Sequence, residues 1–178
     1  MCGIFALLNK STYLTPKFIN DAFMNGKNRG PETSKYTFIN SQTEFGFHRL
    51  AINGLNNASN QPIKINNIML ICNGEIYNYK ELYQDLNIEK TTDSDCEIII
   101  HLYNKYGIDY TLEVLDGVFA FALLDNIDTL STSVHLFSEF FAIALVAVTV
   151  PVVAEPIAAK SAAEIFVPDA SVIVRDPV

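Results

Sequence analysis

The sequence predicts a domain of mixed helices and strands, because two kinds of segment alternate over its first 125 residues. Short apolar runs that end at polar or turn residues are typical of buried strands. Between them lie segments with apolar residues at helical spacing, preceded by capping residues. The chain has 178 residues, of which 49% are hydrophobic and 18% charged, so one globular domain with a sizeable core is expected.

The beginning of the chain predicts three strands and one helix. Residues 2–8 form a short apolar run typical of a buried strand. Thr15-Pro16 has the chemistry of an N-cap and a first helical position. Residues 36–39 and 45–52 are expected to pair as a hairpin. The apolar face of the predicted helix would contain Phe18, Ile19, Ala22 and Phe23.

The middle of the chain predicts a strand and two helices. Residues 68–72 are an apolar run that would end at Asn73-Gly74-Glu75, with a helix over residues 77–86 after it. A second helix would begin in the stretch 92–95, which is rich in capping residues, and would end at Gly107.

A last strand is expected at residues 115–124, and the composition changes directly after it. Residues 1–125 contain fifteen Asn and six Ala, whereas residues 126–178 contain one Asn and nine Ala. We therefore predict a core over residues 1–125, followed by an Ala/Val-rich insertion or tail. Residues 140–154 are nearly all apolar, but a membrane span needs about 20 such residues, so a buried strand or hairpin is favoured.

Charge and cysteine content argue against several classes of function. The formal net charge is −8 and no stripe of Lys and Arg is present, which argues against nucleic acid and membrane partners. The three cysteines are odd in number and lack a CxxC spacing, so neither a disulfide framework nor a metal site is expected. The N-terminus lacks the pattern of a signal peptide, and a cytoplasmic location is expected.

Cys2 is the first candidate for chemistry. Removal of Met1 would place a thiol and a free α-amine on one residue. An α-amine has a pKa of about 7.7–8.0, so near neutral pH it can take the proton of the thiol. This is the N-terminal form of an activated nucleophile. The alternative is a small apolar residue that only opens a strand.

Three further stretches contain groups that suit a substrate. Arg49 lies among apolar residues, and its guanidinium suits a carboxylate, either of a ligand or of an internal Asp or Glu. The Asn73 amide and the Gly74 N–H can form an oxyanion hole, although Asn-Gly is also common in turns. Ser94 and Asp95 open a helix, where either can be an N-cap and Asp95 can hold an ammonium group. With the thiol, these groups describe a site for an amino acid with a side-chain carbonyl.

Seven stretches of residues 1–125 form an ordered set of motifs. They are Met1-Cys2-Gly3-Ile4-Phe5, Arg29-Gly30-Pro31-Glu32, residues 48–52, Gln61-Pro62, Asn73-Gly74-Glu75-Ile76-Tyr77-Asn78, Ser94-Asp95-Cys96-Glu97 and residues 115–123. In this order and spacing they resemble the class II glutamine amidotransferases, a family of N-terminal nucleophile hydrolases. The Asn-Gly-Glu-Ile-Tyr-Asn stretch resembles the glutaminase domain of the asparagine synthetase type.

The resemblance implies catalytic roles for three residues. Cys2 would attack the side-chain amide of glutamine and form a glutamyl thioester, while its own α-amine would move the protons. Asn73 and Gly74 would hold the developing oxyanion. Water would then release glutamate and leave ammonia for amide transfer in asparagine biosynthesis.

The resemblance also implies a binding site for glutamine. Arg49 would bind the α-carboxylate, and Asp95 with Glu75 would orient the α-ammonium group, while Asn73 and Gly74 would also contact the substrate. Backbone contacts would come from the segment that follows Arg49, namely Leu50, Ala51, Ile52 and Asn53.

The fold that the resemblance implies is an α+β, four-layer αββα sandwich, either complete or incomplete at its C-terminus. Two sheets would face each other, with helices outside. A synthetase domain or a separate chain would accept the ammonia, and only that part would need ATP and Mg²⁺. This sequence has no Ser-Gly-Gly-x-Asp-Ser stretch and no Gly-rich phosphate loop, so the chain itself is expected to need no cofactor.

Two departures from the family pattern leave alternatives open. Glu32 stands where the family usually has Asp, and Arg175-Asp176-Pro177 resembles a family motif but follows the Ala/Val-rich stretch. The first hypothesis is a glutamine-hydrolysing enzyme. The alternative is a truncated, non-catalytic glutamine-binding or regulatory module that lacks the synthetase domain. A third is that residues 126–178 prevent stable folding.

Overall fold

The computed structural model describes residues 2–8, 10, 12–52 and 54–125, and beyond them the backbone of four strands. These strands are β7 (Ser133–Ser138), β8 (Val146–Val148), β9 (Ala163–Val167) and β10 (Ala170–Val174), of which β9 and β10 pair as a separate two-stranded sheet. The predicted strand or hairpin over residues 140–154 meets the described part only at β8, and Arg175-Asp176-Pro177 lies outside it.

The first of two four-stranded sheets has the strand order β2-β3-β1-β8. β1 (Gly3–Leu7) pairs antiparallel with β3 (Thr43–Arg49), which in turn pairs antiparallel with β2 (Thr33–Asn40). The predicted first strand and hairpin are therefore confirmed. β3 ends at Arg49 rather than at residue 52, so the segment that follows Arg49 is a loop.

The second sheet has the order β4-β5-β6-β7, and every neighbouring pair in it is antiparallel. Its strands are β4 (Ile63–Ile65), β5 (Ile68–Ile76), β6 (Gly117–Asp125) and β7. The prediction that the strand ends at residue 72 is wrong, because residues 73–76 continue to pair with β6. Cross-strand pairing with β6 therefore overrides the turn preference of Asn-Gly in this stretch.

Helix α1 (Pro16–Met24) starts where its cap predicts. The Thr15 side chain accepts a hydrogen bond from the Phe18 N–H at 3.2 Å. Ile19 and Phe23 pack against Phe5 and Leu7 of β1 in one buried cluster. The assignment of Phe18 to the buried face is wrong, since Phe18 is 42% exposed.

Two helices follow β5 in the chain. Helix α2 (Tyr79–Leu86) begins slightly later than predicted, and the Asp95–Glu97 turn, a short 3₁₀ helix, leads into α3 (Ile98–Val114). α3 is interrupted at the predicted stop, Gly107, whose φ of 81° is left-handed, but helix resumes after it. No helix in the described part of the chain is long and apolar enough to cross a bilayer.

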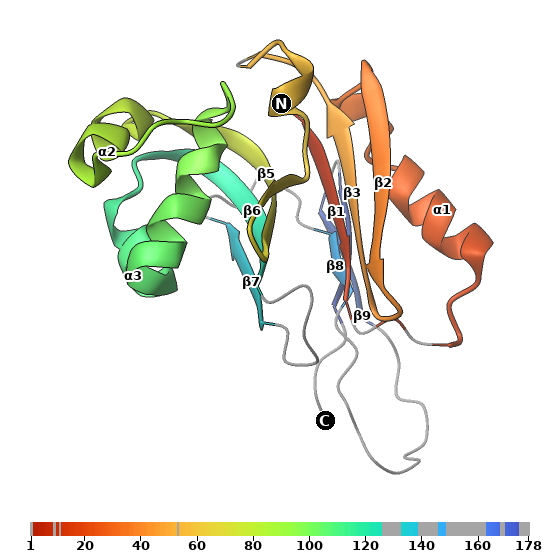
Figure 1. The fold of residues 1–178 in the computed structure, drawn as a ribbon. Coiled ribbons are helices and arrows are strands. Elements are labelled where there is room, and N and C mark those ends of the chain that lie inside the picture. Colours follow the sequence, from red (N-terminus) through yellow and green to blue (C-terminus); the bar gives the residue numbers. More distant parts are fainter. Residues whose placement is uncertain are drawn as a thin grey trace.

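The two four-stranded sheets face each other, and helices cover their outer faces (Figure 1). α1 lies on the outer side of the first sheet, and α2 and α3 lie on the outer side of the second. Successive residues of β5 point to opposite faces, as the period of a strand requires. The side chains between the sheets include Ile4, Phe45, Phe47, Met69, Ile71 and Leu124.

Candidate active site

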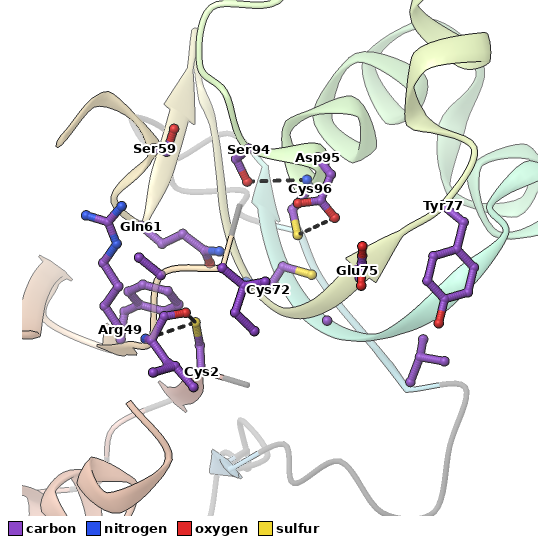
Figure 2. Close-up of a pocket in the computed structure, with 16 residues that line it drawn as sticks. Cys2, Arg49, Ser59, Gln61, Cys72, Glu75, Tyr77, Ser94, Asp95 and Cys96 are labelled. Carbon is purple, nitrogen blue, oxygen red and sulfur yellow. Dashed lines mark hydrogen bonds between the residues drawn. The ribbon is translucent and has the colours of Figure 1, made fainter. Parts of the chain in front are cut away.

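A cavity of about 280 Å³ opens where the N-terminal strand, the end of β3, β5 and the Asp95–Glu97 turn meet. Its volume is close to the lower end of the range for small-molecule sites. Figure 2 shows the side chains around it. The cavity brings together eight predicted site residues: Cys2, Arg49, Leu50, Ala51, Ile52, Gly74, Glu75 and Asp95.

Of the predicted site residues that the structure describes, Asn73 does not line the cavity. Asn73 lies beside it in β5 and is 1% exposed, and Asn53 lies outside the described residues. Eight residues that were not predicted as site residues also line the cavity: Phe47, Ser59, Gln61, Cys72, Tyr77, Ser94, Cys96 and Val118. Of these, Gln61, Tyr77, Ser94, Cys96 and Val118 belong to the motif stretches, which was the signal available in the sequence.

The Cys2 thiol is held against the loop after β3. Its Sγ lies 3.4 Å from both the carbonyl oxygen and the amide nitrogen of Leu50 (Figure 2). Arg29 Nε donates to the Cys2 carbonyl at 3.2 Å, which fixes the backbone of the same residue. Burial raises the pKa of the Cys2 thiol, and the contact with Leu50 offsets only part of this effect. Near neutral pH the thiol therefore stays protonated and needs a base to become a nucleophile.

The Arg29–Glu32 loop binds the backbone of Cys2 and the backbone of the segment that contacts the thiol. While Arg29 binds Cys2, Glu32 Oε1 accepts from the Ala51 N–H at 3.1 Å, and the Glu32 N–H donates to the Arg49 carbonyl at 3.1 Å. A Cβ on Gly30 would lie 2.1 Å from the His48 carbonyl oxygen, so this close approach requires glycine. Glu32 thus has a structural role, since it binds backbone groups on both sides of Leu50.

Arg49 is buried, but its charge is not paired with a carboxylate of the described residues. Its guanidinium donates to three neutral oxygens: Asn60 Oδ1 at 2.6 Å, the Gly54 carbonyl at 2.6 Å and the Asn56 carbonyl at 3.1 Å. A guanidinium has five N–H donors, so these bonds leave donors over. The observed contacts are not an internal ion pair, and the cavity lies beside a cation suited to a carboxylate.

Ser94, rather than Asp95, takes the N-cap role that the sequence allowed for either residue. Ser94 is the N-cap of the Asp95–Glu97 turn and accepts from the Cys96 N–H at 3.3 Å. Asp95 is 4% exposed, and its Oδ2 accepts from the Ile76 N–H of β5 at 2.7 Å. This bond anchors a carboxylate to the end of β5, on the cavity wall.

The Asn73-Gly74 pair carries an unused polar atom. Among the described residues, the buried Asn73 Oδ1 has no hydrogen-bond partner. Leaving such a group unpaired costs about 1–3 kcal/mol. Because Oδ1 is an acceptor, the oxyanion role predicted for Asn73 would depend on the Nδ2 donors of the same amide. Gly74 lines the cavity directly.

In the described part of the chain, no cluster of three or more His, Cys, Asp or Glu is suited to a metal ion.

The family model of the glutamine amidotransferase domain matches residues 1–133. The chain belongs to the glutamine amidotransferase domain family. It is 42% identical over 135 residues to the glutamine-hydrolysing asparagine synthetase of Homo sapiens, covering 71% of this chain and 23% of that protein. The enzymes of that name from Mus musculus and Gallus gallus are 43% and 42% identical, with the same coverage. The chain therefore spans about a quarter of the length of these relatives.

A solved structure shows the same fold. Glutamine phosphoribosylpyrophosphate amidotransferase from B. subtilis, complexed with ADP and GMP, superposes with a TM-score of 0.58 and 22% sequence identity. The match covers 76% of this chain and 37% of that one. The mixed helix and sheet fold of this amidotransferase domain is thus shared with a solved amidotransferase.

Gly74 of this amidotransferase domain leaves no room for a side chain. A Cβ there would lie 2.3 Å from the Val118 carbonyl oxygen and 2.5 Å from Phe119 Cα, both backbone atoms of β6. We expect Gly74→Ala to lower the free energy of unfolding by about 3 kcal/mol, because the two strands must separate. Urea unfolding measures this change.

Gly107→Ala is the control for this prediction. A Cβ at Gly107 meets nothing within 4 Å, so only the left-handed φ opposes the substitution, at about 1–2 kcal/mol. This variant should keep the cavity intact and its Cys2 as reactive as before. Equal unfolding free energies for Gly74→Ala and the unmodified protein would contradict the prediction.

Glu97 anchors the segment that leads to Asp95. It is fully buried, and its carboxylate accepts from the backbone N–H groups of Thr91 and Thr92 at 2.7 and 2.5 Å and contacts His101 Nε2 at 3.1 Å. Burial acts to raise the pKa of Glu97, but these hydrogen bonds outweigh it and lower the pKa to about 2.

The lowered pKa of Glu97 makes the free energy of unfolding depend on pH. The stabilisation is present above the unfolded pKa of about 4.3, where it amounts to about 3 kcal/mol, and is lost as pH falls towards 2. Denaturant unfolding at several pH values should therefore show Glu97→Gln less stable at pH 7, with the difference shrinking below pH about 4. Glu81 on α2 is exposed, so Glu81→Gln is the matched control variant. If both variants changed the free energy of unfolding equally at every pH, the prediction would be refuted.

Proposed function

We propose that this domain hydrolyses glutamine to glutamate and ammonia, with Cys2 as the nucleophile. The observation that carries the proposal is one cavity with the Cys2 thiol, the unpaired Arg49 cation and the Asp95 carboxylate on its walls. A free amino acid has a carboxylate and an ammonium group, which these two charges complement. The names of the glutamine-hydrolysing relatives agree with this substrate.

Glutamine would bind through both of its α-substituents. Its α-carboxylate would take donors of Arg49, and its α-ammonium group would contact Asp95 and Glu75. Backbone groups of the loop after Arg49, including Asn53, would contribute to binding. Held at this end, the side-chain amide would extend towards the Cys2 thiol, which lies against Leu50 on the same cavity wall.

The reaction would require removal of Met1. The freed α-amine of Cys2 would accept the thiol proton as the sulfur attacks the amide carbon. The oxyanion would be held by the Gly74 N–H and the Asn73 amide. Return of the proton to the leaving nitrogen would release ammonia and leave a glutamyl thioester. Water would then add to the thioester carbon, giving its proton to the same amine, and the thiol and glutamate would be restored.

The arrangement of layers favours the N-terminal nucleophile hydrolase fold. We infer a four-layer αββα sandwich from the apolar layer between the two sheets and the helices packed outside each of them. We also propose that residues 1–125 form the glutaminase core and that residues 126–178 are an insertion or tail. Ammonia would pass to a synthetase domain or chain for asparagine formation, and only that part would use ATP and Mg²⁺.

The proposal is tested by following the N-terminus and the thiol together. Intact mass should show loss of Met1, and a glutamine-analogue electrophile such as 6-diazo-5-oxo-L-norleucine should add once, at Cys2. Glutamate should form from glutamine without ATP. A variant with one residue added ahead of Cys2 that is not cleaved should bind glutamine but fail to hydrolyse it, because its base would be an amide. Glutamine binding without turnover in the processed protein would instead identify a binding module.

A further inference from the structure

A polar bridge outside the cavity connects its two charged walls, and we propose that Asn56 and Asp93 are positioning residues that set the span between Arg49 and Asp95. This inference rests on the proposed function, since that span decides how well the two α-substituents of glutamine are held. Neither residue lines the cavity. Their effect would therefore act through the two groups that do.

The first part of the bridge holds the guanidinium. The loop between β3 and β4 supplies all three described acceptors of Arg49, and one of them is the Asn56 carbonyl at 3.1 Å. The guanidinium is thus located by the loop rather than by its own strand. A displacement of Asn56 would displace the cation with it.

The second part crosses to a segment 37 residues further along the chain. Asn56 Nδ2 donates to Asp93 Oδ2 at 2.5 Å, and Asp93 Oδ1 accepts from Lys90 Nζ at 2.6 Å. Both carboxylate oxygens of Asp93 are therefore engaged. The Asp93 N–H also donates to Ser59 Oγ at 3.1 Å, so backbone and side chain of Asp93 both bind the loop.

The third part reaches the other charged wall. Asp93 stands two residues before Asp95, and Ser94 between them caps the turn that carries Asp95. The two segments are in close contact, because a Cβ on Gly54 would lie 2.4 Å from Ser59 Oγ and 3.1 Å from the Asp93 carbonyl carbon. Continuous contacts therefore link the Arg49 guanidinium to the Asp95 carboxylate.

Capping alone does not explain Asn56. Its Oδ1 accepts from the Ser59 N–H at 3.1 Å and from Ser59 Oγ at 3.0 Å. The side chain is therefore the N-cap of the short Asn57–Ser59 helix. An Asp would cap equally well. Only the amide of Asn can also donate to a carboxylate, and that bond is the one that joins the segments.

The substitution Asn56→Asp tests the bond to Asp93 separately from the cap. Asn56→Asp keeps the cap but removes the donor and sets two carboxylates against each other. We expect the KM for glutamine to rise about three- to tenfold, the effect of one lost hydrogen bond, with kcat changed less than about twofold. The double variant Asn56→Asp/Asp93→Asn restores the bond with donor and acceptor exchanged, and should return KM to near its original value.

A matched control separates geometry from charge. Asn57→Asp adds the same charge at the next exposed position of the loop and should leave KM within about twofold. An unchanged KM in Asn56→Asp, or a double variant no better than the single one, would overturn the inference while glutamine turnover by the unmodified protein still supports the proposed function. Absence of turnover and of Cys2 labelling in the unmodified protein would overturn the proposed function, and this inference with it.

Discussion

Replacement of Cys2 by alanine is expected to abolish glutamine hydrolysis, with a loss of at least about 10⁴-fold in kcat, the scale seen when a nucleophile is removed. No other described residue offers a thiol in contact with Leu50 at the cavity wall. Folding should be kept, because Cys2 precedes β1 and only borders the apolar layer between the sheets. Glutamate release, electrophile labelling and thermal unfolding measure the three effects.

The other two cysteines provide the control for Cys2. Cys72 and Cys96 are free thiols that line the same cavity, but both are buried. The neighbouring Cys72 thiol and burial keep the pKa of Cys96 high, so Cys96 is a poor nucleophile. Cys96→Ala should keep turnover and labelling. Turnover that survives in Cys2→Ala and is lost in Cys96→Ala would disprove the assignment of the nucleophile.

Replacement of Arg49 is expected to have the second largest effect. Arg49→Lys keeps the charge but loses the planar fork, and a lost charge-assisted hydrogen bond corresponds to a rise of about 10- to 150-fold in the KM for glutamine. The change in kcat should be small, because the thiol contacts Leu50 and the lysine keeps the positive charge that helps to lower the pKa of Cys2. Steady-state kinetics and protection of Cys2 from the electrophile by glutamate would both report it.

Two comparisons make the Arg49 result specific. Lys64→Ala removes one positive charge from an exposed position on β4, and its KM should stay unchanged. Arg49→Ala should in addition lower stability, because Gly54, Asn56 and Asn60 each lose a donor. If Arg49→Lys bound glutamine as tightly as the unmodified protein, the carboxylate site would have to be placed elsewhere.

Most elements of the fold could be predicted locally. The Thr15 cap, the apolar run of β1 and the β2–β3 hairpin follow from residue chemistry over a few positions. The largest error of prediction, the end of β5, arises because a strand distant in the chain sets the length of the element. β5 continues through Asn73-Gly74 because β6 pairs with it. The strand β4 was not predicted, because its three residues are too few to show a period.

The reactive and charged groups could be read from residue type and position alone: a cysteine at position 2, an arginine among apolar residues, an Asn-Gly pair and a carboxylate at a helix start. The sequence left each of these with a structural alternative. The packed structure bears on two of these alternatives, since it places Arg49 on neutral oxygens and leaves capping to Ser94 while Asp95 binds β5. Residue type and spacing specify only local geometry, whereas the cavity is lined by segments that meet only when the two sheets pack face to face.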